Sequence, residues 1–230
     1  MNGSEPLTAV TRAGAPRDES LSPGWQERRR RVAANIEHVA LEMFTERGYS
    51  EVTVDEIGTR VGCSLRTVTR YFANKEDLLL DFHRRKNQVV LDEFARLEPT
   101  PDLASVIWAV WMALTLNTQS GLDGYLLWKK AAATAPEVMD RANGERRRSV
   151  QLALTAFISA SLGIDPDTDM RPQLIAATLE AANSALVNFW VACGGVEDLY
   201  SMYQDAARSI SELSVSILDA EAFSAIEAQR

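Results

Sequence analysis

Helix start and stop signals lie so close together between residues 48 and 75 that this part of the chain can form only short helices. Glycine accepts the left-handed conformation that is common just after a helix, and Ser, Thr and Asn side chains accept hydrogen bonds from the first free amides of the next one. In chain order the signals are a stop at Gly48, a capping box at Thr53 and Glu56, a second stop at Gly62, and N-caps at Ser64 and Asn74.

Apolar residues around these signals recur at spacings of three and four, as on the buried face of a helix. We expect a first helix over about 26–47, a second that begins near Thr53 and a third that begins after Ser64, with inward residues Ile36, Val39, Ala40, Met43, Phe44, Val54, Ile57, Val61, Val68 and Phe72. The last two helices are joined by a short turn that contains Gly62, which predicts a helix-turn-helix unit. In such a unit the second helix presents its N-terminal residues to base edges in the major groove of DNA.

The charge distribution restricts where nucleic acid could bind, because the chain as a whole carries a net charge of −8. Residues 1–97 contain 15 of the 24 Lys and Arg residues and 15 of the 32 Asp and Glu residues, so their charges balance. Residues 98–230 contain the remaining 9 basic and 17 acidic residues and account for the whole excess. A positively charged surface patch can therefore assemble only within residues 1–97.

The rest of the chain also has helical periodicity, and no segment alternates with the period of a strand for long. We expect further helices at about 75–97, 102–117, 121–133, 136–161, 169–193 and 196–218. The predicted fold is all-α, with a three-helix helix-turn-helix domain followed by a larger helical domain. The predicted divisions are a disordered tail over 1–24, a DNA-binding domain with its connecting helix over 25–97, and a larger helical domain over 98–230.

The apolar residues of the last two helices continue one heptad-like rhythm, which suits an antiparallel helix pair or half of a four-helix bundle completed by a second copy. We place the dimer interface on these two helices. The residues expected in the interface are Leu179, Leu186, Tyr203, Ile210, Leu213 and Ile217.

Residues 35–79, "NIEHVALEMFTERGYSEVTVDEIGTRVGCSLRTVTRYFANKEDLL", resemble the TetR family of bacterial transcriptional regulators. The landmarks are a phenylalanine and glycine that close the first helix, then "TVDEIG", "VGCS" and "YF-x-NK-x-DLL". The rear half matches only in its helical layout. Many family members have "S-x-G-T-L-Y" where this chain has "SLRTVT", so Arg66 replaces a small residue and Thr69 replaces a tyrosine that often touches DNA. The resemblance implies an operator-binding homodimer with an inducer cavity in the rear domain, so that residues 98–230 form an effector-binding and dimerisation domain.

The candidate DNA contacts fall into three groups. Arg66 and Arg70 are candidates for hydrogen bonds to guanine. Leu65 and Thr69 are candidates for contact with a thymine methyl group. Matching family positions imply phosphate contacts for Thr53, Ser64, Thr67, Tyr71 and Lys75. Arg28 and Arg29 belong to a basic run that is favoured for a backbone or minor-groove contact, with a solvated surface as the alternative.

Aromatic residues of the rear part are the candidates for an effector pocket, although each fits a packed core as well. They are Trp108, Trp111, Tyr125, Trp128, Phe157, Phe189 and Trp190. The uncharged helices at 103–116 and 149–162 predict an apolar cavity, with Lys129 and Lys130 at its rim. For the basic run 146–148 a solvated surface is preferred.

Together these features predict a ligand-responsive, sequence-specific DNA-binding repressor in the cytoplasm that acts as a homodimer on a double-stranded operator. One alternative is a regulator whose rear domain serves only dimerisation or a protein partner. An all-α enzyme is disfavoured, because His38 and His83 are isolated and no nucleophile–base pair stands out. Neither cofactor nor metal is expected, and the run 103–122 suits a core helix better than a membrane span. The effector, the operator, the regulated genes and the sign of regulation do not follow from the sequence.

Overall fold

The structure is a computed structural model that describes residues 23–102, 107, 111 and 121–218, with side chains up to residue 209. The described residues form helices and contain no strand, so the predicted all-α fold is confirmed. The chain divides into two compact units, Met1–Leu79 and Leu80–Arg230. We call them the first and the second unit.

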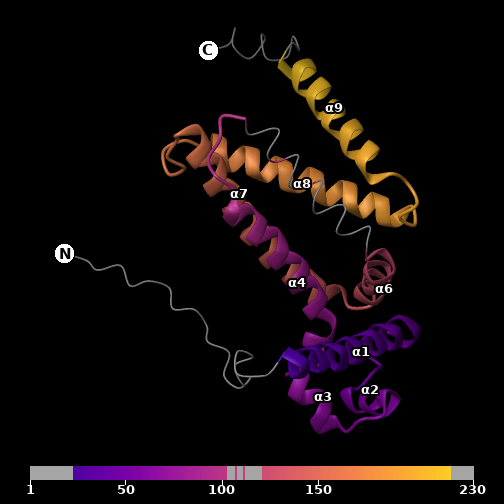
Figure 1. The fold of residues 1–230 in the computed structure, drawn as a ribbon. Helices are drawn as coiled ribbons and strands as arrows, with labels where there is room; N and C mark the ends of the chain where they lie inside the picture. The colour runs from indigo at the N-terminus through magenta and orange to yellow at the C-terminus, as the bar shows by residue number, and fades with distance from the viewer. Residues whose placement is uncertain (1–22, 103–106, 108–110, 112–120, 219–230) are drawn as a thin grey trace, which may run out of the picture. The chain divides into compact units, whose positions relative to one another are not determined.

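The first unit contains three helices and the start of a fourth (Figure 1). They are α1 (Pro23–Arg47), α2 (Val54–Val61), α3 (Leu65–Tyr71) and the beginning of α4 (Lys75–Arg96). A shared apolar core holds these helices together, and its fully buried side chains include Ile36, Ala40, Phe44, Val52, Ile57, Val68, Leu78 and Leu79. The helix boundaries and the inward faces of α1 and α3 agree with the predictions.

The predicted caps are present and explain why these helices are short. Thr53 and Glu56 form a complete capping box at the start of α2, and Gly62 ends α2 in the left-handed conformation with φ 79°. The Ser64 side chain accepts from the Thr67 amide at the start of α3. Asn74 Oδ1 accepts from the Asp77 amide, 2.9 Å away, at the start of α4.

Gly58 allows α2 to approach the turn that precedes α3. A Cβ atom at this position would lie 2.9 Å from the Cys63 carbonyl oxygen and 3.3 Å from Val68 Cγ2. The same turn is closed by a hydrogen bond from the Cys63 amide to the Gly58 carbonyl. The glycine therefore sets how closely the two helices of the helix-turn-helix unit pack.

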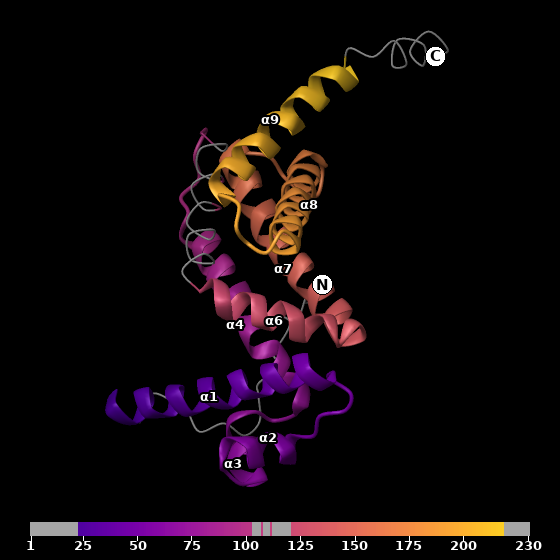
Figure 2. The same ribbon diagram turned by 90° about the vertical axis from the view of Figure 1, so that its right-hand side faces the viewer.

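The second unit contains the remainder of α4 and four further labelled helices (Figure 2). They are α6 (Leu122–Ala133), α7 (Pro136–Leu162), α8 (Arg171–Ala192) and α9 (Leu199–Leu218). The predicted boundaries differ from these by at most a few residues, whereas the helix expected over 102–117 lies almost wholly outside the described residues.

Two apolar clusters hold the second unit together. The first joins α4, α7 and α8, with Phe94, Leu154 and Ile158 among its buried members. The second joins α8 to α9 through Leu186, Trp190, Leu199 and Tyr203. These clusters use one face of α8.

The opposite face of α8 is apolar and exposed. Leu174 is 55% exposed and Phe189 is 62% exposed, and the small exposed residues Ala181 and Ala185 lie between them. Of the described helices, α8 is long and apolar enough to cross a membrane, but one helix of this kind is weak evidence, since core helices have similar compositions. Only 22% of its most apolar window is buried within this chain.

Candidate functional site

The exposed surface of α3 is the candidate nucleic-acid interface. Val68 is fully buried, whereas Leu65, Arg66, Thr69 and Arg70 are exposed, as the spacing predicted. The Arg66 side chain makes no ion pair or hydrogen bond among the described residues. Its guanidinium donors are therefore available to a base edge or a phosphate.

Two hydroxyl groups of α3 are already engaged with the helix. Thr69 Oγ1 donates to the carbonyls of Leu65 and Arg66, at 3.1 and 3.2 Å. Ser64 Oγ lies 3.0 Å from Thr67 Oγ1, within hydrogen-bond distance. Since the Thr69 proton is used internally, this residue is left with its methyl group and an acceptor oxygen for an outside partner.

Tyr71 brings two predicted DNA-contacting arginines together. Arg70 Nη2 donates to the Tyr71 hydroxyl at 3.2 Å, and the Arg70 guanidinium carbon lies 5.1 Å from the ring centroid. The Arg29 guanidinium carbon, from α1, lies 5.9 Å from the same centroid. The N-terminal part of α1 and the end of α3 thus present one basic surface, although no contact with another described residue places Arg28 there.

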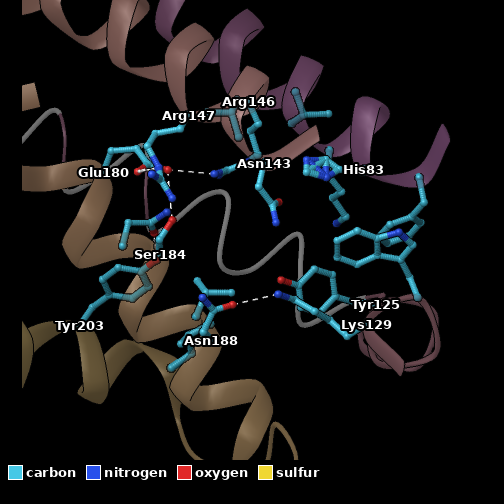
Figure 3. Close-up of a pocket in the computed structure, with 18 residues that line it drawn as sticks. His83, Tyr125, Lys129, Asn143, Arg146, Arg147, Glu180, Ser184, Asn188 and Tyr203 are labelled. Carbon is cyan, nitrogen blue, oxygen red and sulfur yellow. Dashed lines mark hydrogen bonds and ion pairs between the residues drawn. The ribbon is translucent and has the colours of Figure 1, made fainter. Parts of the chain in front are cut away.

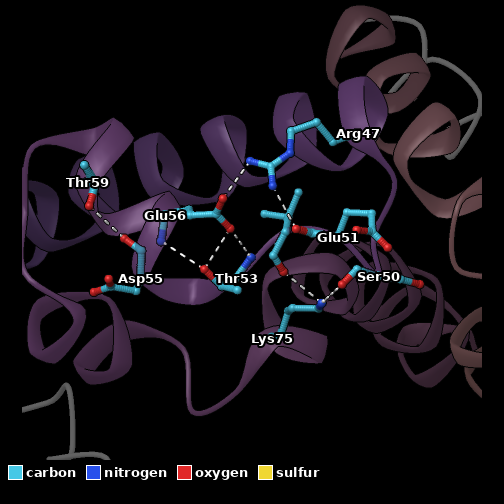
Figure 4. A network of polar contacts seen from close by, with 9 residues as sticks. Arg47, Ser50, Glu51, Thr53, Asp55, Glu56, Thr59 and Lys75 are labelled. Atoms are coloured by element: carbon cyan, nitrogen blue, oxygen red, sulfur yellow. Dashed lines mark hydrogen bonds and ion pairs between the residues drawn. The ribbon is translucent and has the colours of Figure 1, made fainter.

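Lys75 has a structural role that the sequence did not suggest. Its Nζ donates to the carbonyls of Val52, at 2.8 Å, and Ser50, at 3.3 Å (Figure 4). The same nitrogen lies 4.3 Å from the centroid of the Tyr49 ring. Lys75 therefore ties the start of α4 to the loop between α1 and α2, and one of its three N–H groups stays available to a phosphate.

Glu56 is the centre of the neighbouring polar network (Figure 4). Its Oε2 accepts from the Thr53 amide and hydroxyl, both at 2.8 Å, and its Oε1 lies 2.9 Å from Arg47 Nη1. These hydrogen bonds from Thr53, and then the one from Arg47, lower the pKa of Glu56 to about 2. The α2 cap is thus joined to the end of α1.

A second candidate site is a cavity of about 240 Å³ in the second unit (Figure 3). Residues of α4, α6, α7, α8 and the start of α9 line it. Of the predicted pocket aromatics, Tyr125 and Trp128 are among the lining residues. The sequence led us to expect an apolar cavity, yet the described lining also contains Lys86, Lys129, Asn143, Arg146, Arg147, Glu180, Asn183, Ser184 and Asn188.

Glu180 and Arg146 form a partly buried ion pair across the cavity (Figure 3). The Glu180 side chain is 3% exposed, and its Oε1 lies 2.9 Å from Arg146 Nη1. Ser184 Oγ donates to the same oxygen at 3.1 Å, and Arg147 Nε lies 3.9 Å from the other carboxylate oxygen. The preferred interpretation of 146–148 as a solvated run is wrong for Arg146, because α8 supplies a buried carboxylate 34 positions further along the chain.

His83 lies beside the same cavity, and sequence analysis had treated it as an isolated residue. It is 7% exposed, and neither ring nitrogen has a hydrogen-bond partner among the described residues. Burial, followed by the positive charges of Arg146, Lys129 and Arg84, lowers the pKa of His83 to about 4. The imidazole is therefore neutral at pH 7 and can donate one hydrogen bond and accept another.

Residues 36–82 match the family described as bacterial regulatory proteins of the tetR family. The chain is 27% identical over 194 residues to the HTH-type transcriptional regulator TcmR of Streptomyces glaucescens, covering 80% of this chain and 84% of that protein. This protein belongs to the TetR family of transcriptional regulators. It is a DNA-binding protein of the helix-turn-helix class, and its relatives are regulators rather than enzymes.

Solved structures similar to this TetR-family regulator support the fold. A putative transcriptional regulator from Pseudomonas aeruginosa PAO1 aligns with a TM-score of 0.57 at 15% identity, covering 86% of this chain and 95% of that one. The SmeT–triclosan complex aligns with a TM-score of 0.55 at 17% identity, covering 76% of this chain and 88% of that one.

The other predicted pocket aromatics of this regulator are not among the described lining residues. Phe157 and Trp190 are buried in the two apolar clusters, and Trp111 packs against both. Phe189 is on the exposed face of α8, and Trp108 lies outside the described residues. Helical spacing alone could not separate core from cavity, because both are enclosed by the same helix faces.

The predicted interface residues need a similar correction. Leu186 and Tyr203 are buried inside the subunit, and Leu179 packs against the first apolar cluster, so these side chains are used within one chain. The side chains of Ile210, Leu213 and Ile217 lie outside the described part of α9. The heptad-like rhythm of α8 includes the buried Leu186 as well as the exposed Phe189, and the exposed apolar face lies opposite the buried one.

Proposed function

We propose that this TetR-family regulator is a repressor that a small molecule releases from its operator, and that it acts as a homodimer in the cytoplasm. The observation that carries the proposal is the combination of an exposed basic reading surface in one unit and a polar cavity in the other. The SmeT–triclosan complex, which shares the fold, is a precedent for a small ligand on such a scaffold. A cavity beside a buried imidazole that has no hydrogen-bond partner among the described residues disfavours the alternative of a rear domain used only for dimerisation.

Base recognition is assigned to Arg66 and Arg70, with Leu65 and Thr69 against thymine methyl groups. Backbone contacts are assigned to the polar groups around the ends of α2, α3 and α4, and to the N-terminal arginines, namely Arg28, Arg29, Thr53, Ser64, Thr67, Tyr71 and Lys75. The Tyr71 ring holds Arg29 and Arg70 near each other before DNA arrives, which reduces the entropy lost on binding.

Dimerisation is assigned to the exposed face of α8. Leu174, Thr178, Ala181, Ala185, Phe189 and Ala192 share it at spacings of three and four. Small residues at its centre let two helices approach closely, and larger apolar residues at both ends supply area to bury. Replacing Ala185 with Glu should give monomers that keep their helical circular dichroism, and light scattering that still reports a dimer would place the interface elsewhere.

Effector control requires that the ligand prefer one of two conformations of the dimer, since it can shift the equilibrium only by its differential affinity. Helix α4 is suited to carry this coupling. It begins with Lys75, which is tied to the loop before α2, and it continues into the cavity wall with His83 and Lys86. Movement of the wall can therefore be transmitted along one continuous helix.

Genomic fragments selected by the full-length protein, followed by footprinting, test the function directly. We expect a protected palindrome, and protection of no site at any salt concentration would overturn the proposal. On that operator, Arg66→Ala and Arg70→Ala should each cost about 1–3 kcal/mol and relax the preference for one base pair. Arg148→Ala, an exposed arginine of the second unit, is the matched control and should bind like the wild type.

A further inference from the structure

The cavity of the second unit has an excess of positive charge. Four described lining residues are cationic and one is a carboxylate, namely Lys86, Lys129, Arg146 and Arg147 against Glu180. Glu180 is neutralised by Arg146 at 2.9 Å and approached by Arg147 at 3.9 Å. Positive charge therefore remains in the cavity, although residues 98–230 as a whole are strongly acidic.

Lys129 is the cation best placed to receive an anionic group. Its Nζ donates to the Oδ1 atom of the neutral Asn188 amide at 2.9 Å, and it lies 5.8 and 5.6 Å from the ring centroids of Tyr125 and Trp128. Burial, and then the charge of Arg146, lower the pKa of Lys129. An anion beside Nζ would offset both effects, because it favours the protonated amine.

Aromatic rings form one wall beside this amine. Phe82 and Trp128 stack with their centroids 5.6 Å apart, and Tyr125 lies 5.7 Å from Trp128. Burial raises the pKa of the Tyr125 phenol to about 12, so this ring stays neutral. Flat apolar rings of this kind favour an aromatic ligand that can stack against them or meet them edge-on.

His83 provides an independent indication that the ligand is polar. Its ring lies 5.4 Å from Trp128, at the end of the aromatic wall, and both of its buried nitrogens lack a partner among the described residues. Leaving a buried donor or acceptor unsatisfied is costly, so such groups usually meet a ligand or water.

Taking the small-molecule control of the proposed function as its basis, we propose that the effector is a small planar aromatic carboxylate. Its ring packs against Phe82 and Trp128, and its carboxylate accepts from the Lys129 amine. The volume of about 240 Å³ lies just below the range of roughly 300–1,000 Å³ usual for drug-sized ligands, which limits the ligand to a few fused or linked rings.

Calorimetric titration of the full-length protein tests this with three compounds of one shape, naphthoate, naphthalenemethanol and naphthylmethylammonium. We expect naphthoate to bind at least about tenfold more tightly than the alcohol, as for a hydrogen bond between two charged groups, and the ammonium compound to bind least. Lys129→Met should reduce naphthoate affinity to that of the alcohol and leave alcohol binding unchanged. Lys130→Met is the matched control, because the neighbouring lysine is exposed and does not line the cavity.

Equal or tighter binding of the alcohol or the ammonium compound would overturn the carboxylate assignment, as would binding by none of the three. Neither result touches the repressor function, which footprinting tests without a ligand. If naphthoate binds with the expected selectivity and operator DNA is not released, the binding site stands and its role in regulation is wrong.

Discussion

The two units place their charged side chains in opposite ways. In the first unit, Arg66 and Arg70 project from a short helix into solvent, where a charge costs little and a polyanion can reach it. In the second unit, Glu180 is almost fully buried, and His83 is kept neutral by its burial and by the neighbouring cations. Charge is costly to bury unless it is paired, so its presence beside a cavity points to binding rather than to stability.

The largest effect is expected from breaking the buried pair of the second unit. Arg146→Met leaves the Glu180 carboxylate with the Ser184 hydroxyl and, 3.9 Å away, Arg147 as its only charged partner among the described residues, which should lower the free energy of unfolding by about 3–5 kcal/mol. Urea unfolding measures this loss. Arg148→Met, which alters an exposed arginine of the same helix, should stay within about 0.5 kcal/mol of the wild type. Similar free energies of unfolding for the two variants would show that the Arg146–Glu180 ion pair does not stabilise the second unit.

Acid should destabilise the second unit through His83. The pKa of His83 falls from 6.5 to about 4 on folding. Between pH 4 and pH 6.5 the unfolded chain therefore binds more protons than the folded chain. This part of the stability is complete above pH 6.5, and about 3 kcal/mol of it is lost as the pH falls to about 4. The positive charges of Arg84, Lys129 and Arg146 persist throughout this window. His83→Phe should remove this part of the pH dependence in thermal melts, and an unchanged slope would contradict it.

Gly58→Ala should destabilise the first unit by about 1–2 kcal/mol, because the new Cβ atom would lie 2.9 Å from a backbone oxygen. Gly144→Ala is the matched control. That glycine is also inside a helix, but open space surrounds it, so alanine should add about 0.5–1 kcal/mol through helix propensity. Thermal melts of the two variants should therefore move in opposite directions, and parallel shifts would show that helix propensity, not packing, decides both.

The smallest effect is expected at the exposed cap of the first unit. The pKa of Glu56 falls from 4.5 to about 2 on folding, so its contribution is present above pH 4.5 and is lost as the pH falls towards 2. Glu56→Gln should melt slightly below the wild type at pH 7, and the difference should shrink in this acid window. Glu51→Gln, an exposed residue outside the capping box, should show no such convergence.

The sequence alone predicted the helices of the first unit, because the interactions that start and end these helices are local. The hydrogen bonds of Thr53, Ser64 and Asn74 reach only three residues along the chain, and the stop at Gly62 depends on its own backbone conformation. Even so, the bond between Lys75 and Val52 spans 23 positions, and no local pattern indicated it.

In the second unit the sequence determined where the helices lie along the chain. The tertiary structure decided which helix faces are buried, which line the cavity and which are exposed. Helical spacing places Leu186 and Phe189 on one seam, yet the first is buried and the second is exposed, because α9 covers only part of α8. Lys129 meets Asn188 across 59 positions, and Arg146 meets Glu180 across 34. A cavity arises where several helices leave space between them, so its lining depends on packing angles that no single segment encodes.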